Sequence, residues 1–183
     1  MSCCETGAPT DEAAPFDEEK APAPQDAAGC GCARCGSASR LVTRRTVLLM
    51  LRPELLDRAV EGEYRFCTGP DCRVVYFTEG EGPCFTTDDM RVRVGLKEKD
   101  DPVPLCYCFG FDERDAREEI ARTGQCSIPR RISALIKQGM CACLERNPSG
   151  ACCLGEVNRA VKRLLAGADE APTVGVAVEE VVP

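Results

Sequence analysis

The chain contains no histidine and no tryptophan among its 183 residues. Without histidine it cannot form a Cys–His nucleophilic pair, a Rieske centre with two histidine ligands or a histidine-bearing zinc hydrolase site. Tight sites for soft metals must therefore be built from thiolates or must include carboxylates. Aromatic residues make up only 5% of the chain, so the hydrophobic core is modest and metal crosslinks would help it to fold.

Long apolar runs and an excess of positive charge are missing too. The longest aliphatic run covers residues 47–51, about a quarter of the length that a membrane-spanning helix needs, so we expect no membrane insertion. The formal net charge is −7, which disfavours binding to nucleic acid through its phosphates. The N-terminus has no basic start followed by an apolar stretch, so we expect no export signal and a cytoplasmic location.

What the chain has in abundance is cysteine, with 15 residues of this type. Thiols persist in a reducing compartment, where dense cysteines indicate metal ligands rather than disulfide bonds. The odd number of cysteines agrees with that interpretation. We therefore predict a protein built around metal–thiolate sites.

Composition and pattern divide the chain into four parts, and the predicted fold class is α+β. Residues 1–29 carry seven acids against one lysine, together with many prolines and alanines, and are predicted to be disordered. Residues 30–100 are predicted to form a small β-rich zinc-binding unit. Residues 101–167 are predicted to form a three-helix unit, and residues 168–183 a flexible tail.

Short runs of β-branched and aromatic residues in the β-rich unit are typical of strands. We predict strands over residues 40–51 (one strand or a bent pair), 64–66, 74–77 and 91–96. Proline is tolerated in the first turn of a helix, so a short helix is predicted to begin at Pro53. In the second unit, Asp112 and Asp115 form a predicted capping box for a helix over residues 113–123. Two further helices are predicted over residues 130–138 and 154–167.

Two cysteine pairs in the β-rich unit have the spacing of a zinc site. In Cys32-x2-Cys35, two thiolates from one turn can reach the same ion, and Cys67-x4-Cys72 supplies a second turn about thirty residues later. Zinc prefers four such ligands at tetrahedral directions. A closed four-thiolate site leaves no position for a substrate, so we expect this zinc to stabilise the fold.

A second set of cysteines begins at Cys106 and Cys108, which are too close along the chain for an ordinary disulfide. Such a pair can chelate one iron of a two-iron cluster, and a pair from the loop between the second and third helices can hold the other iron. That loop offers two pairs of thiols, Cys141 with Cys143 and Cys152 with Cys153. Adjacent side chains point in different directions, so one thiol of each pair is expected to ligate. Spacing alone leaves a second zinc site equally open.

From about residue 32 to residue 166 the sequence resembles the N-terminal domain of the CopZ family of copper chaperones. The blocks that carry the resemblance are YRFCTGPDCRVVYF, FTTDDMRVRVGLKEKDDPVPLCYCFGF and NPSGACCLGEV. In that family the domain carries a mononuclear zinc and a [2Fe-2S] cluster, and its second half resembles bacterioferritin-associated ferredoxin. The resemblance therefore favours an iron–sulfur cluster over a second zinc.

The resemblance also implies which residues hold each metal. For zinc it implies Cys32, Cys35, Cys67 and Cys72. For the [2Fe-2S] cluster it implies Cys106, Cys108, one residue of each ambiguous pair, of which we select Cys143 and Cys153, with Cys141 and Cys152 as alternates. Full-length family members add a copper-transfer domain with a Met-x-Cys-x-x-Cys loop, and this chain has neither that motif nor room for the domain after Gly167. We therefore expect no copper delivery by such a domain.

The predicted function is that of a metallochaperone-like protein of copper or soft-metal homeostasis, with the cluster as a one-electron centre that reduces Cu(II) to Cu(I). The resemblance implies copper as cargo and a copper-transfer protein or copper-exporting ATPase as partner, whereas the electron donor is not identified. The alternatives are a ferredoxin-like electron carrier for iron release, and a non-redox structural adaptor or metal sensor. No general base or substrate pocket is evident, so we do not expect a conventional enzyme. Cys3 and Cys4 are a further candidate pair for Cu(I), because thiolates prefer soft ions.

Overall fold

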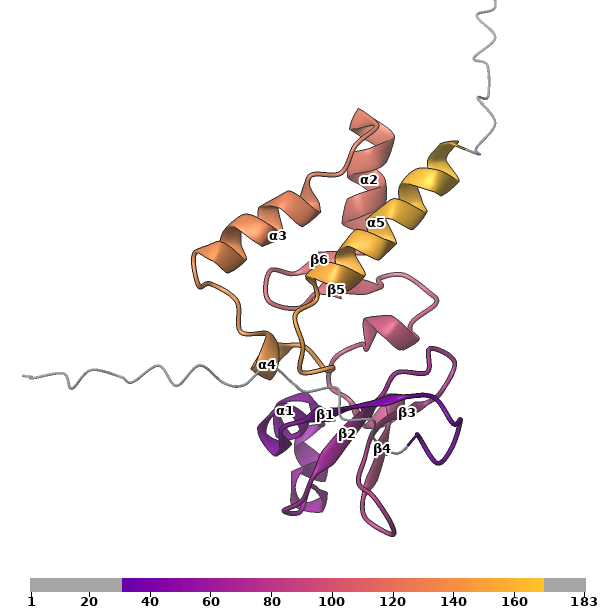
Figure 1. Ribbon diagram of the computed structural model, residues 1–183, viewed down its shortest axis with the longest axis vertical. Coiled ribbons are helices and arrows are strands. Elements are labelled where there is room, and N and C mark those ends of the chain that lie inside the picture. Colours follow the sequence, from indigo (N-terminus) through magenta and orange to yellow (C-terminus); the bar gives the residue numbers. More distant parts are fainter. Residues whose placement is uncertain (1–30, 170–183) are drawn as a thin grey trace, which may run out of the picture.

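A sheet unit and a helical unit stack end to end along the long axis of the molecule (Figure 1). The structure, a computed structural model, describes residues 31–169. The predictions made for residues 1–29, and those for the tail beyond residue 169, lie outside the described residues. Within the described part, a small antiparallel sheet followed by helices confirms the predicted α+β class. The boundary predicted between residues 100 and 101 stays a prediction.

The sheet unit is built on four antiparallel strands in the order β1-β2-β3-β4. The strands are β1 (Ser39–Val42), β2 (Tyr64–Cys67), β3 (Val74–Phe77) and β4 (Cys84–Thr86). Phe66 of β2 lies opposite Arg40 of β1 and Tyr76 of β3. β2 and β3 are buried along their whole length, as expected of short strands rich in aromatic and β-branched residues. The predicted strands at residues 64–66 and 74–77 are confirmed, whereas β4 was not predicted.

The prediction of a strand over residues 40–51 is wrong beyond Val42. Thr43 caps a helix, α1 (Arg44–Met50), by accepting a hydrogen bond from the amide of Thr46 at 3.1 Å. The helix buries Thr46, Val47 and Met50, which recur at helical spacing, while the intervening leucines are only partly buried. The apolar residues that follow Val42 therefore recur at helical spacing, although the composition of this segment favours a strand.

The other predictions for the sheet unit have mixed outcomes. A short helical segment does begin at Pro53, as the 3₁₀ helix η1 (Pro53–Arg58). Two further 3₁₀ turns follow, η2 (Thr87–Asp89) and η3 (Gly95–Lys97). The predicted strand at residues 91–96 is wrong, since this segment has no strand partner apart from an isolated bridge between Met90 and Leu51 next to it. Gly95 ends the extended stretch where a Cβ would lie 2.0 Å from the carbonyl oxygen of Pro104.

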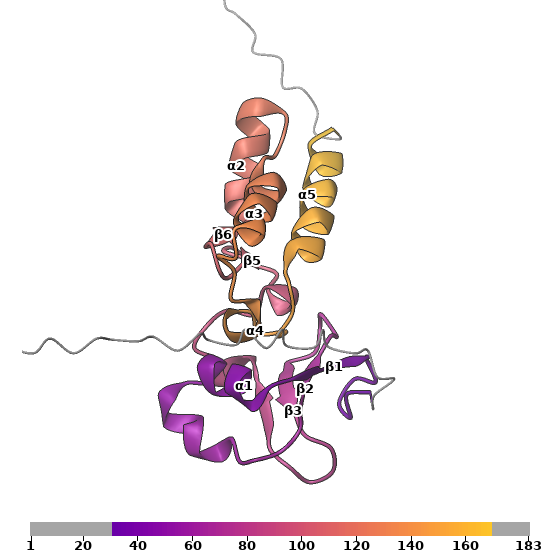
Figure 2. The ribbon, with the colours of Figure 1, turned by 60° about the vertical axis from the view of Figure 1, so that its left-hand side comes forward.

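The helical unit begins with a small hairpin that was not predicted, β5 (Pro104–Cys106) and β6 (Phe111–Asp112). The capping box is confirmed, because Asp112 and Asp115 each accept the other's amide at 3.0 Å at the start of α2 (Glu113–Thr123). The remaining helices are α3 (Ile128–Lys137), the unpredicted short α4 (Cys143–Arg146) and α5 (Leu154–Asp169). α5 runs alongside α2 and α3, and their facing apolar residues form the core of this unit (Figure 2).

Hydrogen bonds between the two units hold them together at the level of α4. The Tyr76 hydroxyl of β3 donates to the carbonyl oxygen of Pro148 at 2.7 Å, and the Thr46 hydroxyl of α1 donates to that of Leu144, also at 2.7 Å. On another side, the Tyr107 hydroxyl accepts from the amide of Gly95 at 2.7 Å. Between residues 31 and 169, no helix is both long and apolar enough to cross a membrane.

Candidate metal centres

Four thiols of the sheet unit converge on one point, and we call them the first thiol set. The Sγ atoms of Cys32, Cys35, Cys67 and Cys72 all lie within 4.8 Å of one another. The Sγ atoms of Cys35 and Cys67 are 3.6 Å apart. Zn–S bonds of about 2.3 Å at tetrahedral angles place sulfur atoms about 3.8 Å apart, so this set has the dimensions of a four-thiolate zinc site.

Two tight turns bring these thiols together. In the first turn the amide of Gly36 donates to the carbonyl oxygen of Cys32 at 2.7 Å, with Gly36 in the left-handed region at φ +72°. The second turn connects β2 to β3 and contains Gly69, where a Cβ would lie 2.7 Å from the hydroxyl of Ser37 and 3.1 Å from the Cys35 sulfur. Glycine at position 69 therefore lets the two turns approach closely enough for their thiols to meet.

The first thiol set is largely buried. Cys32, Cys67 and Cys72 are 2%, 0% and 7% exposed, whereas Cys35 is exposed. Hydrogen bonds from Ser37 lower the pKa of the Cys35 thiol to about 6, and burial raises that of Cys67 to about 12. Several thiolates cannot be buried together without a compensating cation. The donor set therefore suits a divalent soft-metal ion, and all four residues predicted for zinc are among those brought together.

A second thiol set, Cys106, Cys108, Cys143 and Cys153, lies in the helical unit. The Sγ atoms of Cys108 and Cys143 are 3.7 Å apart. The thiol of Cys153 lies close enough to those of Cys106 and Cys143 to interact with both, which joins the four sulfur atoms in one chain of contacts. Cys106 and Cys153 are each 1% exposed, and the other two are partly buried.

Separate elements contribute these four thiols. Cys106 ends β5, and Cys108 lies in the hairpin turn, where the amide of Gly110 donates to the carbonyl oxygen of Cys106 at 2.9 Å. Cys143 opens α4. Cys153 stands just before α5, and its carbonyl oxygen accepts the amide of Val157 at 2.9 Å. The hairpin, α4 and the start of α5 thus meet at the second thiol set.

The surroundings of the second thiol set favour the thiolate form of two of its four residues. Interaction with the Cys153 thiol lowers the pKa of Cys143 to about 5 and that of Cys106 to about 7. The same two interactions raise the pKa of Cys153. The amide of Ala142 donates to the Cys108 sulfur at 3.3 Å, although burial still raises the pKa of Cys108 to about 11. Negative charge at this set is therefore partly stabilised by the chain itself.

Cys141 and Cys152 are the alternative cluster ligands predicted from the sequence. The Cys141 thiol is partly buried and contacts the thiol of Cys143. Cys152 is exposed, in contrast to its neighbour Cys153. The remaining thiols lie elsewhere, with Cys84 on β4 and Cys126 beside the carboxylate of Glu119 at 3.8 Å. The structure thus brings Cys143 and Cys153, and not Cys141 and Cys152, into contact with the hairpin thiols.

Sequence reasoning missed the residues that hold the loop between α4 and α5 in place. Tyr76 of the sheet unit binds the carbonyl oxygen of Pro148 in this loop, Thr46 binds that of Leu144 in α4, and α1 packs against α4. Gly150 in this loop has φ +62°, and a Cβ there would lie 3.2 Å from the side chain of Val42. No sequence signal marked Tyr76 for this role, because aromatic residues in strands are typical of any sheet core.

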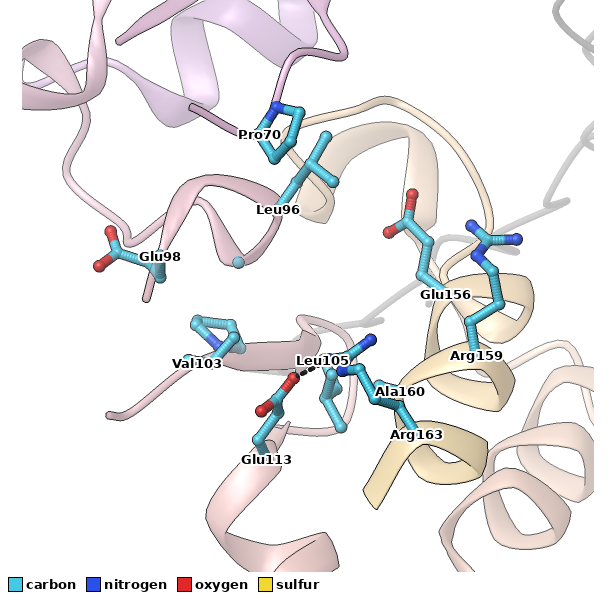
Figure 3. A pocket seen from close by; sticks show the side chains of 12 residues that line it. Pro70, Leu96, Glu98, Val103, Leu105, Glu113, Glu156, Arg159, Ala160 and Arg163 are labelled. Atoms are coloured by element: carbon cyan, nitrogen blue, oxygen red, sulfur yellow. Dashed lines mark hydrogen bonds and ion pairs between the residues drawn. The ribbon is translucent and has the colours of Figure 1, made fainter. Parts of the chain in front are cut away.

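A cavity of about 290 Å³ separates the turn of the first thiol set from the strand of the second (Figure 3). Pro70, from the turn between Cys67 and Cys72, faces it on one side, and Leu105, next to Cys106, faces it on the other. Glu113 and Arg163 form an ion pair at 2.6 Å across its wall. Residues of both the sheet unit and the helical unit therefore line this cavity.

Comparison with known proteins gives three related findings. A family model described as a zinc-binding domain, of the CopZ type, matches residues 30–91. The copper chaperone CopZ of Archaeoglobus fulgidus is 30% identical over 128 residues, which cover 70% of this chain and 60% of that protein. This chain thus spans about 60% of the length of that relative.

The third finding is a solved structure. The X-ray structure of the N-terminal domain of Archaeoglobus fulgidus CopZ matches with a TM-score of 0.57 and 30% identity. The match covers 70% of this chain and 95% of that domain. Because the identity extends over nearly the whole of a solved domain with the same fold, this chain belongs to the CopZ family.

Proposed function

We propose that this chain acts in copper homeostasis, with a structural zinc on the first thiol set and a [2Fe-2S] redox centre on the second. The observation that carries the proposal is the meeting of Cys106, Cys108, Cys143 and Cys153, two of them 1% exposed, from segments far apart in the sequence. The matched relative is a copper chaperone by name, which supports copper as the metal that is handled.

The first thiol set supports a purely structural zinc. Its four thiols come from the turn before β1 and the turn between β2 and β3, which lie at the same end of the sheet because Ser39 pairs with Cys67, so one ion would crosslink these two turns. Four sulfur ligands would fill all positions around a tetrahedral ion and would leave no site for a substrate. We therefore assign Cys32, Cys35, Cys67 and Cys72 to zinc and expect no reaction there.

The shape of the second thiol set supports two metal ions rather than one. Within the described part of the chain, only the first thiol set has donor atoms that all converge in one compact group. The second set is more extended, running from Cys106 through Cys153 and Cys143 to Cys108. Two irons that share bridging sulfides need two thiolates each, spread over a longer site than a single zinc needs.

Burial supports Cys143 and Cys153 as the ligands from the two ambiguous pairs. Cys153 is 1% exposed and contacts thiols of both other segments, whereas Cys152 is exposed. Cys143 lies 3.7 Å from Cys108, and Cys141 contacts Cys143. A [2Fe-2S] cluster bound here supplies one electron at a time, and the amide of Ala142 would bond one of its ligand sulfurs.

Copper reduction is the reaction that we propose, with Cu(II) as substrate. Cu(II) accepts one electron from the reduced protein and becomes Cu(I), which thiolates bind in preference to Cu(II). Anaerobic mixing of the reduced protein with one equivalent of Cu(II) is expected to restore the visible spectrum of the oxidised protein and to yield Cu(I), measured with a Cu(I)-specific chromogenic chelator. A spectrum that does not change would reject copper reduction.

Further redox measurements on the protein separate the two alternative functions from copper reduction. Electron transfer to a ferredoxin reductase or a ferritin partner without any response to copper would favour a ferredoxin-like carrier. A centre that cannot be reduced in the physiological range would favour a structural adaptor or metal sensor. The reaction that we propose is stoichiometric metal reduction, without a conventional catalytic site. A copper-transfer protein or copper-exporting ATPase is the partner class that it implies.

Tyr76→Phe is expected to loosen the loop between α4 and α5, which carries Cys153 of the second thiol set, while leaving zinc bound. The change removes the buried hydrogen bond to Pro148 and leaves that carbonyl oxygen without its partner, at a cost of about 1–3 kcal/mol in the free energy of unfolding. Chemical denaturation measures this cost, and release of iron to a chelator measures the loosening of the loop.

Tyr64→Phe is the matched control for this change. Its hydroxyl donates to the carbonyl oxygen of Val60 at 3.0 Å, inside the sheet unit and away from the loop. It should cost stability without increasing the rate of iron release. Equal rates of iron release from the two variants would contradict a positioning role for Tyr76.

A further inference from the structure

A groove of about 610 Å³ lies between the C-terminal halves of α2 and α5. Both helices end on the side of the molecule that faces away from the sheet unit (Figure 2). All the residues that line the groove belong to α5, to α2 or to Gly124, which caps α2. Two packed helices of the helical unit therefore leave a hollow between their last turns.

Three large apolar side chains line this groove. Ile120 is 7% exposed, and Leu164 and Leu165 are partly buried against the core of the helical unit. The other lining residues near the end of α2 are Ala121 and Gly124, which have little or no side chain to fill the hollow. An apolar occupant would remove the remaining apolar surface from water.

Positive charge lies deeper in the groove. Arg117 stands two turns before Gly124 on α2, and Arg163 one turn before the end of the groove at Gly167 on α5. The two guanidinium groups share the carboxylate of Glu113, at 3.3 and 2.6 Å. Their side chains are 40% and 64% exposed, so both can accept a further carboxylate.

The chain continues from the mouth of the groove as residues 170–183, EAPTVGVAVEEVVP, which lie outside the described residues. α5 ends at Asp169, only two positions after Gly167. Three valines of the segment alternate with a glycine and an alanine: Val174, Val176 and Val178. In an extended conformation these three side chains would share one face.

The length and order of this segment match the groove. Residues 170–173 are available for a reversal of the chain, and Pro172 opposes continuation of the helix. Five extended residues span about 16 Å, against about 10 Å for the two turns from Arg117 to Gly124. A segment that runs back along α5 meets the apolar end first and the arginines second. In the same order, the sequence offers valines and then Glu179 and Glu180.

We propose that residues 174–178 occupy the groove of their own chain in an extended conformation. The three valines cover the apolar lining, and the two glutamates that follow lie beside Arg163 and Arg117. Attachment to α5 favours this occupant, because a tethered segment has a high effective concentration at a site within its reach. The docked segment stabilises the helical unit, and this role does not depend on which metals the chain binds.

A tryptophan at position 176 tests the docking, because the chain has no tryptophan of its own. In the full chain with its metals bound, the Val176→Trp variant is expected to emit at a shorter wavelength than a free peptide of residues 170–183 with the same change. The physical reason is that an apolar groove withdraws the indole ring from water. Emission at the wavelength of the free peptide would overturn the proposal.

A matched pair of second substitutions locates the docked segment. Ala121 is exposed and lines the groove, so Ala121→Glu places a carboxylate against the valines and should return the emission to that of the free peptide. Ala134 is exposed on α3, outside the groove, and Ala134→Glu should leave the shift unchanged. A shift that survives Ala121→Glu would place the segment elsewhere and reject the groove.

Hydrogen exchange tests the same docking without an added ring. The Val174→Ser/Val176→Ser/Val178→Ser variant is expected to exchange the amides of residues 118–124 more than about tenfold faster than the unaltered chain, because the groove loses its apolar cover. The amides of α3 should not change. Unchanged exchange at residues 118–124 would contradict the docking. Protection that rises with protein concentration would assign the groove to the segment of a second copy and would overturn docking within one chain.

Discussion

Replacing Cys67 with serine is expected to abolish zinc binding and to unfold the sheet unit. Cys67 is completely buried at the end of the central strand β2, and its thiol belongs to the one group of four that crosslinks the sheet. A structural zinc contributes about 10–16 kcal/mol to small metal-bound domains at neutral pH, more than a modest core can replace. We expect the thermal midpoint of this unit to fall by more than about 15 °C.

Zinc content by atomic spectroscopy and thermal unfolding by circular dichroism measure this effect. Cys84→Ser is the matched control, because Cys84 is an exposed thiol on β4 of the same sheet and lies outside the first thiol set. This control should keep one zinc per chain and an unchanged thermal midpoint. A Cys67→Ser protein that still unfolds cooperatively with a full complement of zinc would contradict the assignment.

Replacing Cys153 with alanine is expected to reduce the iron and sulfide of the chain from two each to almost none. Its thiol is 1% exposed and contacts Cys106 and Cys143, so no other thiol can take its place without moving the anchored loop. The two irons of such a cluster need four thiolates, and three cannot complete both coordination shells. Iron and sulfide analysis of anaerobically purified protein, with visible and EPR spectra, measures the loss.

Cys152→Ala provides a control that differs by one position in the chain. Cys152 is exposed, in contrast to the buried Cys153, so this variant should keep its colour and its full iron content. Both variants should keep zinc, because the first thiol set lies in the other unit. If the Cys152 variant loses its iron and the Cys153 variant keeps it, the assignment of these two residues is reversed.

Several features of the fold follow from residues that are close in the sequence. The capping box of Asp112 and Asp115 starts α2 where its pattern predicts, and the left-handed Gly124 ends that helix. The cysteine spacing in the first turn predicts the knuckle that the Gly36 amide closes. Each of these features depends on hydrogen bonds between residues a few positions apart, so a single sequence is enough to predict them.

Other features depend on the register of a segment against its neighbours. The residues after Val42 favour strand by composition, yet the cap at Thr43 and the burial of Val47 and Met50 make them a helix. Residues 91–96 alternate like a strand, but Gly95 lies against Pro104, a contact that the local pattern does not reveal. Tertiary contacts outweighed local propensity in both places.

The amino-acid sequence by itself determined the kind of metal site that this chain can build, because without histidine and with abundant cysteine its tight soft-metal sites must consist of thiolates or include carboxylates. It also determined the turn that pairs Cys32 with Cys35. Only the tertiary structure decided how the hairpin, α4 and the start of α5 meet at the second thiol set. The bonds from Tyr76 to Pro148 and from Thr46 to Leu144 join residues 72 and 98 positions apart, and contacts of that range depend on how the whole chain packs.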